Sequence, residues 1–160
     1  MKPTPAFGSG LAGALALTLV HEGMKRIYPK APRMDLLGMT ALSKILKSMG
    51  KSSPQKNKLF GWTMVGDVLS NSLYYSLAGV GKRKDALFRG AMLGLVAGAG
   101  AVLLPKPLHL NEAHTNRTAQ TKLLTIGLYL VGGLVAAAVL RNNYKKTQKA
   151  NRKYLLKATA

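Results

Sequence analysis

The sequence predicts an all-α integral membrane protein, a four-helix bundle in a single membrane domain that spans residues 1–160. Three observations predict this class. Hydrophobic residues make up 48% of the chain and yet its formal net charge is +19, an unusual combination for a water-soluble domain. The Lys and Arg residues collect in blocks instead of alternating with apolar residues. Long, nearly uncharged windows separate these blocks, which is the pattern of membrane-spanning segments.

Four of these windows are predicted to cross a bilayer as helices. A helix rises about 1.5 Å per residue and the hydrocarbon core is about 30 Å thick, so a crossing needs about 20 residues. The windows are residues 5–22, 59–80, 87–105 and 123–141. A secretory signal peptide is the alternative for the first window because Lys2 precedes an apolar run, but no small residues stand at the spacing of a cleavage site.

The first connection is long and basic, and its middle, residues 35–49, is predicted to form an amphipathic helix. Apolar residues fall on one arc and polar residues on the other, Leu42, Ile45, Leu46 and Met49 against Thr40, Ser43, Lys44 and Lys47. A helix of this kind fits the headgroup plane of a membrane. A soluble helix that packs on its own protein is the alternative.

The last predicted crossing continues into a basic helical tail, residues 142–160. Anionic lipid headgroups are the expected partners of this tail and of the first loop, through Lys44, Lys47, Lys145, Lys146 and Lys149. Nucleic acid is not expected as a partner, because few aromatic residues are interleaved with the basic ones. The Lys and Arg residues divide evenly between the two sides of a four-crossing topology, so the positive-inside rule gives no orientation.

Small residues recur at intervals of four in the third window, where Gly90, Gly94 and Gly98 share one helix face. The fourth window offers Gly132 and Gly133 in the same way. Membrane helices associate where small residues let their backbones approach closely. We therefore expect these glycines to pack helices together, either within one chain or between copies in a homo-oligomer or a larger membrane complex.

Asp67 is the residue that points most directly to function. It follows Leu59 by about 12 Å of helix, which predicts a position near mid-membrane. A carboxyl group there costs about 2.5 kcal/mol or more unless it is paired, protonated or hydrated. Asn71 and Tyr74 follow on the same helix face and form a polar stripe with it.

His21 and Glu22, at the end of the first window, complete this candidate intramembrane polar site. His21 and Arg89 are the candidate partners of Asp67 on other helices. Two interpretations of the stripe remain open, namely a structural hydrogen-bond network and a path for protons or a solute.

Known catalytic and metal-binding patterns are not found. A zinc-protease motif needs a second His four residues after His21, but that position is Lys25. The chain has three His residues and no Cys, so neither a metal site nor a cofactor is expected. The few acidic residues are dispersed, so no catalytic pair is nominated and an enzyme is not expected.

Three segments, namely His21-Glu22, residues 32–39 and residues 66–75, resemble those of small uncharacterised multi-pass proteins of bacterial inner membranes. The resemblance implies a multi-pass protein of the bacterial inner (cytoplasmic) membrane. It carries no activity, ligand or catalytic residue with it.

The sequence therefore predicts a non-enzymatic membrane protein, a structural or accessory component of a membrane assembly that binds anionic lipid. The alternative is a small homo-oligomeric proton-coupled transporter or channel that uses the stripe of Asp67.

Overall fold

The computed structural model describes residues 3–158, with side chains at 5–82, 84–144 and 147. This part of the chain is all-helical, as predicted, with six α-helices and two short 3-10 turns. The elements are α1 (Pro3–Ile27), α2 (Met34–Ser48), α3 (Lys56–Ser76), η1 (Leu77–Gly79), η2 (Arg83–Asp85), α4 (Ala86–Leu103), α5 (Ala113–Asn116) and α6 (Ala119–Ala158).

Proline and glycine set several of the boundaries between these elements. Pro29 and Pro32 separate α1 from α2, and Pro54 precedes the start of α3. Neither residue type occurs in the chain after Gly133, so nothing interrupts α6 before Ala158. The expected helical continuation into the basic tail is thereby present in the backbone.

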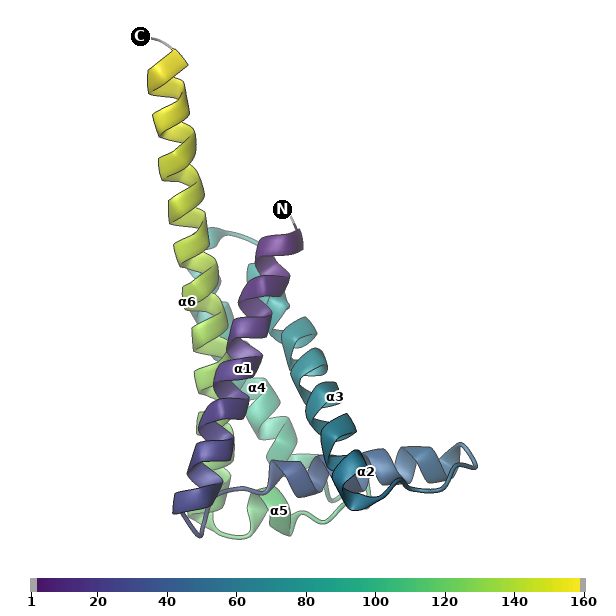
Figure 1. The fold of residues 1–160 in the computed structure, drawn as a ribbon. Coiled ribbons are helices and arrows are strands. Elements are labelled where there is room, and N and C mark those ends of the chain that lie inside the picture. Colours follow the sequence, from purple (N-terminus) through teal and green to yellow (C-terminus); the bar gives the residue numbers. More distant parts are fainter. Residues whose placement is uncertain (1–2, 159–160) are drawn as a thin grey trace.

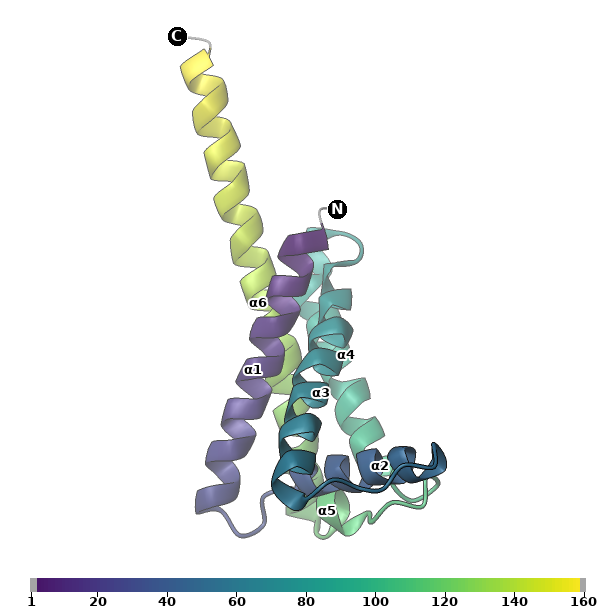
Figure 2. The same ribbon diagram turned by 45° about the vertical axis from the view of Figure 1, so that its right-hand side comes forward.

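The four long helices α1, α3, α4 and α6 run alongside one another in alternating directions, and α2 lies across one end of them (Figure 1). We call this end, with residues 28–55 and 104–118, the α2 end. The turn of residues 77–85 and the described start of α1 lie at the other end, which we call the turn end. A second view shows the same arrangement and the far half of α6 projecting beyond the turn end (Figure 2).

Two of the long helices in the described part are long and apolar enough to cross a membrane, α4 and residues Ala119–Tyr144 of α6. They correspond to the predicted third and fourth crossings. The predicted second crossing is α3 followed by η1, in which Asp67 and Asn71 interrupt the apolar residues.

Glycines bring the backbones of α4 and α6 together. Gly90 lies against the backbone carbonyl of Gly133, and Gly133 in turn lies against that of Gly90. A Cβ added at Gly94 would stand 2.6 Å from Cα of Leu130, and one at Gly98 2.7 Å from Cα of Ile126. Since real Cβ atoms do not come so close to backbone, only glycine fits along this seam.

The other face of α6 packs on α1, so α6 lies between α4 and α1. Gly13 of α1 lies against the carbonyl of Gly132 and the side chain of Ala136. On its far side α1 packs on α3, where Gly10 meets the backbone of Ser72. The order across the bundle is therefore α3, α1, α6 and α4, so that α3 and α4 share few contacts although a short turn connects them.

Two tyrosines of α3 fill the space that this order leaves. Tyr75 is fully buried, its ring lies against Gly132, and its hydroxyl donates a hydrogen bond of 2.8 Å to the carbonyl of Tyr129. Tyr74 donates one of 3.0 Å to the carbonyl of Leu93 in α4. The α3 helix is thus tied to α4 and α6 by hydroxyl groups more than by close backbone packing.

The seam gives a prediction with a matched control in the same helix. Gly94→Ala should lower the stability of the protein in mild detergent by about 1–3 kcal/mol, because the new methyl group forces α4 away from α6. Gly100→Ala should be neutral or stabilising by up to about 1 kcal/mol, because its Cβ would meet only Leu104 Cδ1, at 3.5 Å. Thermal unfolding measures the stability of both variants. Equal melting temperatures would contradict the close packing of α4 on α6 at Gly94.

Candidate functional site

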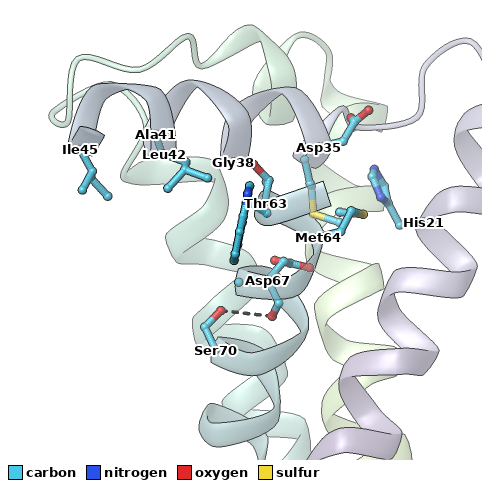
Figure 3. A pocket seen from close by; sticks show the side chains of 13 residues that line it. His21, Asp35, Gly38, Ala41, Leu42, Ile45, Thr63, Met64, Asp67 and Ser70 are labelled. Atoms are coloured by element: carbon cyan, nitrogen blue, oxygen red, sulfur yellow. Dashed lines mark hydrogen bonds between the residues drawn. The ribbon is translucent and has the colours of Figure 1, made fainter. Parts of the chain in front are cut away.

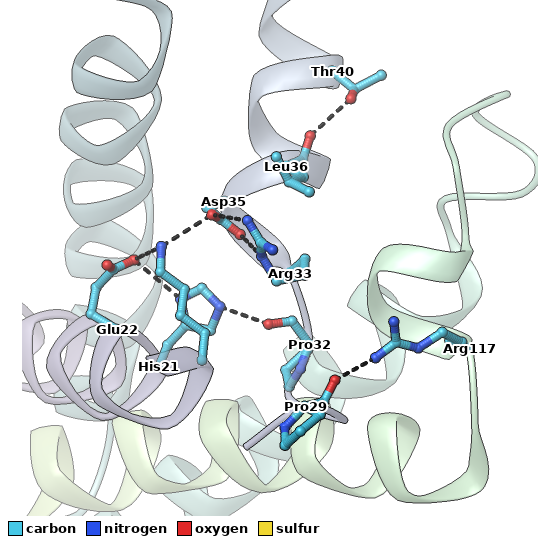
Figure 4. A network of polar contacts seen from close by, with 10 residues as sticks. His21, Glu22, Pro29, Pro32, Arg33, Asp35, Leu36, Thr40 and Arg117 are labelled. Carbon is cyan, nitrogen blue, oxygen red and sulfur yellow. Dashed lines mark hydrogen bonds and ion pairs between the residues drawn. The ribbon is translucent and has the colours of Figure 1, made fainter. Parts of the chain in front are cut away.

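Asp35, the second residue of α2, is the centre of an ion network at the α2 end (Figure 4). Its carboxylate accepts two hydrogen bonds from the guanidinium of Arg33, each 3.2 Å long, and one of 3.0 Å from Nζ of Lys25. Asp35 is only 4% exposed. A buried carboxylate needs partners of this kind, because burial without them is costly.

Lys25 extends the network to α1. Its Nζ lies 2.6 Å from Oε1 of Glu22 and 5.3 Å from the ring centre of Phe60 in α3. One ammonium group therefore joins carboxylates of α1 and α2 and an aromatic face of α3. Since Lys25 and Arg33 balance Glu22 and Asp35, the network carries no net charge.

His21 of α1 is buried beside this network and contacts the linker between α1 and α2. Its Nε2 lies 3.0 Å from the carbonyl oxygen of Pro32, and a carbonyl can only accept, so Nε2 carries the hydrogen. Its Nδ1 lies 3.7 Å from Oε1 of Glu22. The two residues singled out at the end of the first window, His21 and Glu22, thus face the ion network.

The network sets the protonation of Asp35. Burial alone would raise the pKa of its carboxyl group, but hydrogen bonds and the positive charges of Arg33 and Lys25 outweigh burial and lower the pKa to about 2. The folded protein therefore keeps Asp35 ionised far into the acidic range.

Polar side chains from α6 and from the turn before it close the α2 end by binding backbone carbonyls of the same linker. Arg117 donates a hydrogen bond of 2.7 Å to the carbonyl of Pro29, and the buried hydroxyl of Thr121 donates one of 3.0 Å to that of Lys30. The backbone N–H of Arg33 donates one of 2.7 Å to the carbonyl of His114. None of these contacts was predicted, since nothing local in the sequence pairs residues about 90 positions apart.

Asp67 lies on α3 and lines a cavity of about 330 Å³ beneath α2 (Figure 3). Its Oδ1 accepts a hydrogen bond of 3.0 Å from Nδ2 of Asn71. His21, one of its candidate partners, lines the same cavity without a hydrogen bond to it. Arg89, the other candidate, is turned to the carbonyls of Ala78 and Lys82 at 3.2 and 2.8 Å, so the expected pairing with Asp67 is not formed.

The polar stripe of α3 divides between two cavities. Asp67 lines the cavity beneath α2, whereas Asn71 and Tyr74 line a second one of about 520 Å³ between α3 and α4. Ser70 lines both. Asp67 and Tyr74 are therefore not part of one pocket, and the hydrogen bond between Asp67 and Asn71 lies where the two cavities adjoin.

Lysines of α2 gather on the opposite side of that helix. Lys44, Lys47 and the nearby Lys56 line a hollow of about 550 Å³ together with Thr40, Ser43 and His114. Nζ of Lys44 donates a hydrogen bond of 2.7 Å to the carbonyl of Leu108. The other lysines predicted to meet lipid headgroups, Lys145, Lys146 and Lys149, have side chains outside the described residues.

Sequence reasoning overlooked three contributors to the site. Asp35 was detectable as one of only five acidic residues in a strongly basic chain. Trp62 and Met64 line the cavity beneath α2. Their position there depends on how α3 and α2 cross, which the sequence alone does not reveal.

Within the described residues, no group of three or more His, Asp or Glu side chains is placed to hold a metal ion. No protein-family model, curated protein or solved structure matches the chain.

The lowered pKa of Asp35 predicts a pH dependence of stability. The pKa of Asp35 is about 2 in the folded protein, below the 3.8 of an unperturbed Asp. The network therefore contributes its full share to the free energy of unfolding above pH 3.8, and this share is lost as the pH falls through about 2. The loss should be about 2 kcal/mol. Unfolding in detergent between pH 6 and pH 2 measures it.

Asp35→Asn should remove this acid sensitivity and lower the free energy of unfolding at neutral pH by at least about 2 kcal/mol, because Lys25 and Arg33 lose their shared partner. Asp85→Asn is the control, since the side chain of Asp85 makes no hydrogen bond at the start of α4. Equal acid sensitivity in wild-type protein and Asp35→Asn would refute the assignment.

Proposed function

We propose that this chain is a non-enzymatic multi-pass membrane protein whose helices α1, α3, α4 and α6 all cross the bilayer and whose basic α2 end binds anionic lipid. In this proposal it is a structural or accessory component of an assembly in a bacterial inner membrane. The distribution of side-chain size between the inside and the outside of the bundle is the observation that carries it.

The interior of the bundle is built largely from small residues. Seven of its buried apolar residues are alanines, and the helix contacts described above are made by glycines. The outside, in contrast, carries many large apolar side chains on all four long helices, among them Leu15, Leu19, Trp62, Leu73, Phe88, Val96, Leu123 and Leu134. A soluble bundle would bury such side chains, whereas a bundle in lipid exposes them and packs through small residues.

The α3 helix supports a crossing although Asp67 and Asn71 reduce its hydropathy. Trp62, Val65, Leu69, Leu73 and Leu77 follow one another along its outer face, and each is between 49% and 66% exposed. Asn71 and Ser72 on its inner face are buried. Asn71 and Ser72 are therefore turned towards the protein and the large apolar side chains towards the surroundings, as a bilayer requires.

The two faces of α2 support an interfacial position for this helix. Leu42 and Ile45 line the cavity next to α3, on the side of the bundle body (Figure 3). Thr40, Lys44 and Lys47 line the hollow on the other side, which also has apolar residues in its walls. A helix that lies across the bundle end with its apolar face inwards and its lysines outwards fits a headgroup plane.

A structural or accessory role agrees with the way the polar groups are used. Glu22 and Asp35 are bound in the ion network, and Glu112 accepts a hydrogen bond of 3.2 Å from Asn116. Asp67 lines the same cavity as Asp35, but the carboxylate of Asp35 is held by Lys25 and Arg33. Acid–base catalysis by a pair of carboxyl groups would need both of them free to act on a substrate.

A small homo-oligomeric proton-coupled transporter or channel is the second candidate. The observation in its favour is that the cavities on either side of the Asp67–Asn71 hydrogen bond share Ser70 as a wall. A path between them would pass the carboxylate of Asp67, as paths for protons or ions often do in membrane proteins.

The number of crossings is tested by single cysteines, because the natural chain contains none. The exposed sites Ser52, Lys82 and Lys106 precede α3, follow η1 and follow α4 respectively. If all four helices cross, Ser52→Cys and Lys106→Cys should react with an impermeant maleimide from one side of the membrane, and Lys82→Cys from the other.

A protein in which only α4 and α6 cross gives a different pattern in the same experiment. Ser52→Cys and Lys82→Cys would then react from one side and Lys106→Cys from the other. Extraction of the protein from membranes by alkaline carbonate, without any detergent, would contradict both topologies.

Lipid binding is tested by the stability that lipid confers. Phosphatidylglycerol added to the protein in detergent should raise its melting temperature more than phosphatidylcholine does. The double variant Lys44→Gln, Lys47→Gln should lose much of this difference, while Lys82→Gln, Lys84→Gln at the turn end should lose less. An unchanged preference in the first double variant would rule out α2 as the lipid-binding element.

A further inference from the structure

We propose that the cavity beneath α2 binds a lipophilic monovalent cation, with Asp67 as its counter-ion and Trp62 as an aromatic wall. This inference goes beyond lipid binding by the lysines, which line the other face of α2. It rests on the shape of the cavity, its one unneutralised charge and the nature of its walls.

The cavity has an open mouth and a closed inner end. Ile45 and Trp62 at its rim are 56% and 66% exposed, and Ser70 is exposed as well. His21 and Asp35 at its inner end are buried. Its volume of about 330 Å³ lies in the range of small-molecule sites in proteins. A ligand could therefore enter from the side, next to the exposed apolar face of α3.

Asp67 supplies the cavity with a carboxyl group, which is a counter-ion for a bound cation in its ionised form. Asp35, the other carboxylate in its wall, is neutralised by Arg33 and Lys25. Among the described side chains, no Lys or Arg forms an ion pair with Asp67, and its protein hydrogen bond comes from the neutral amide of Asn71. In a chain of net charge +19, the cavity is thus a place where a cation meets an unpaired carboxylate.

The remaining walls favour an apolar cation over a hydrated one. Leu42, Ile45 and Met64 line the cavity (Figure 3), and so do Met34 and Trp62. Aromatic rings, Trp above all, attract cations over their faces, and the attraction is stronger where water is excluded. A metal ion would need several ligands gathered around one point, and no group of three or more His, Asp or Glu side chains among the described residues is placed in that way.

Gly38 lets α2 lie close to α3 at this cavity. A Cβ at this position would stand 2.6 Å from Cγ2 of Thr63. The roof of the cavity is therefore fixed by a direct helix contact at Gly38, while the apolar side chains of Leu42 and Ile45 continue it towards the mouth.

Trp62 is the only tryptophan in the chain, so its fluorescence reports directly on this cavity. Purified full-length protein in a mild detergent is titrated with tetraphenylphosphonium, and in parallel with tetraphenylborate, which has the same shape and the opposite charge. We expect saturable quenching by the cation and at least about tenfold weaker binding of the anion. Equal affinities for the two ions would overturn the proposal.

Asp67→Asn keeps the size of the side chain and removes its charge, so it should weaken tetraphenylphosphonium binding by about tenfold or more. Asp67→Glu should retain most of the affinity, and Asp85→Asn, at the turn end, should leave it unchanged. Unaltered binding in Asp67→Asn would overturn the proposal even if the lysine variants behave as expected for lipid.

A second pair of variants keeps the test independent of the folding of Asp67→Asn. Ala41 lines the same cavity from α2. Ala41→Lys should weaken tetraphenylphosphonium binding, whereas Ala41→Glu should strengthen it. Equal effects of the two substitutions would show that charge in this cavity does not govern binding and would overturn the proposal.

Discussion

The hydrogen bonds that Asp35 accepts from Lys25 and Arg33 hold the α2 end together, and the geometry of the site depends on them. They fix the first turn of α2 against the last turns of α1 and thereby set the direction in which α2 leaves the bundle. That direction places Gly38 on Thr63 and Leu42 over the cavity. Without this anchor, an amphipathic helix across the end of a bundle would have nothing but apolar contacts to orient it.

The bundle itself depends on a different constraint, the small size of the residues between its helices. In the membrane setting that we propose, apolar side chains gain little by moving from lipid into the protein, so close backbone contact would take over much of the stabilising role of a hydrophobic core. The α6 helix illustrates this. Gly133 faces Gly90 of α4, the carbonyl of Gly132 lies against Gly13 of α1, and the missing side chain of Gly132 leaves room for the ring of Tyr75. The hydroxyls of Tyr74 and Tyr75 then tie in α3, which contributes few small residues to the side facing α4.

Much of the helix content followed from the sequence, because the position of a helix is set locally by apolar runs and by proline. The predicted helix at residues 35–49 differs from α2 by one residue at each end. Of its predicted apolar arc, Leu42 and Ile45 line the cavity next to α3, whereas Met49 is exposed. The candidate site was harder to predict. Arg89 was a reasonable partner for Asp67 by distance along the chain, but its guanidinium binds carbonyls freed where α3 ends. Tyr74 shares a helix face with Asp67, yet its hydroxyl donates a hydrogen bond to the carbonyl of Leu93 in α4. No local pattern in the sequence reveals that α4 lies there.

The position of Asp67 shows why the depth of a residue cannot be counted from the end of its own helix. Eight residues separate it from Leu59, which by length alone would carry it halfway across a bilayer. The first turns of α3, however, run past α2, and Asp67 lines the cavity directly beneath that helix together with Gly38 and Leu42. If α2 marks the headgroup plane, a carboxylate in this position lies close to water on one side and to acyl chains on the other. Such a place makes an ionised group less costly than mid-membrane would, and it leaves the charge within reach of a cation that arrives from the lipid.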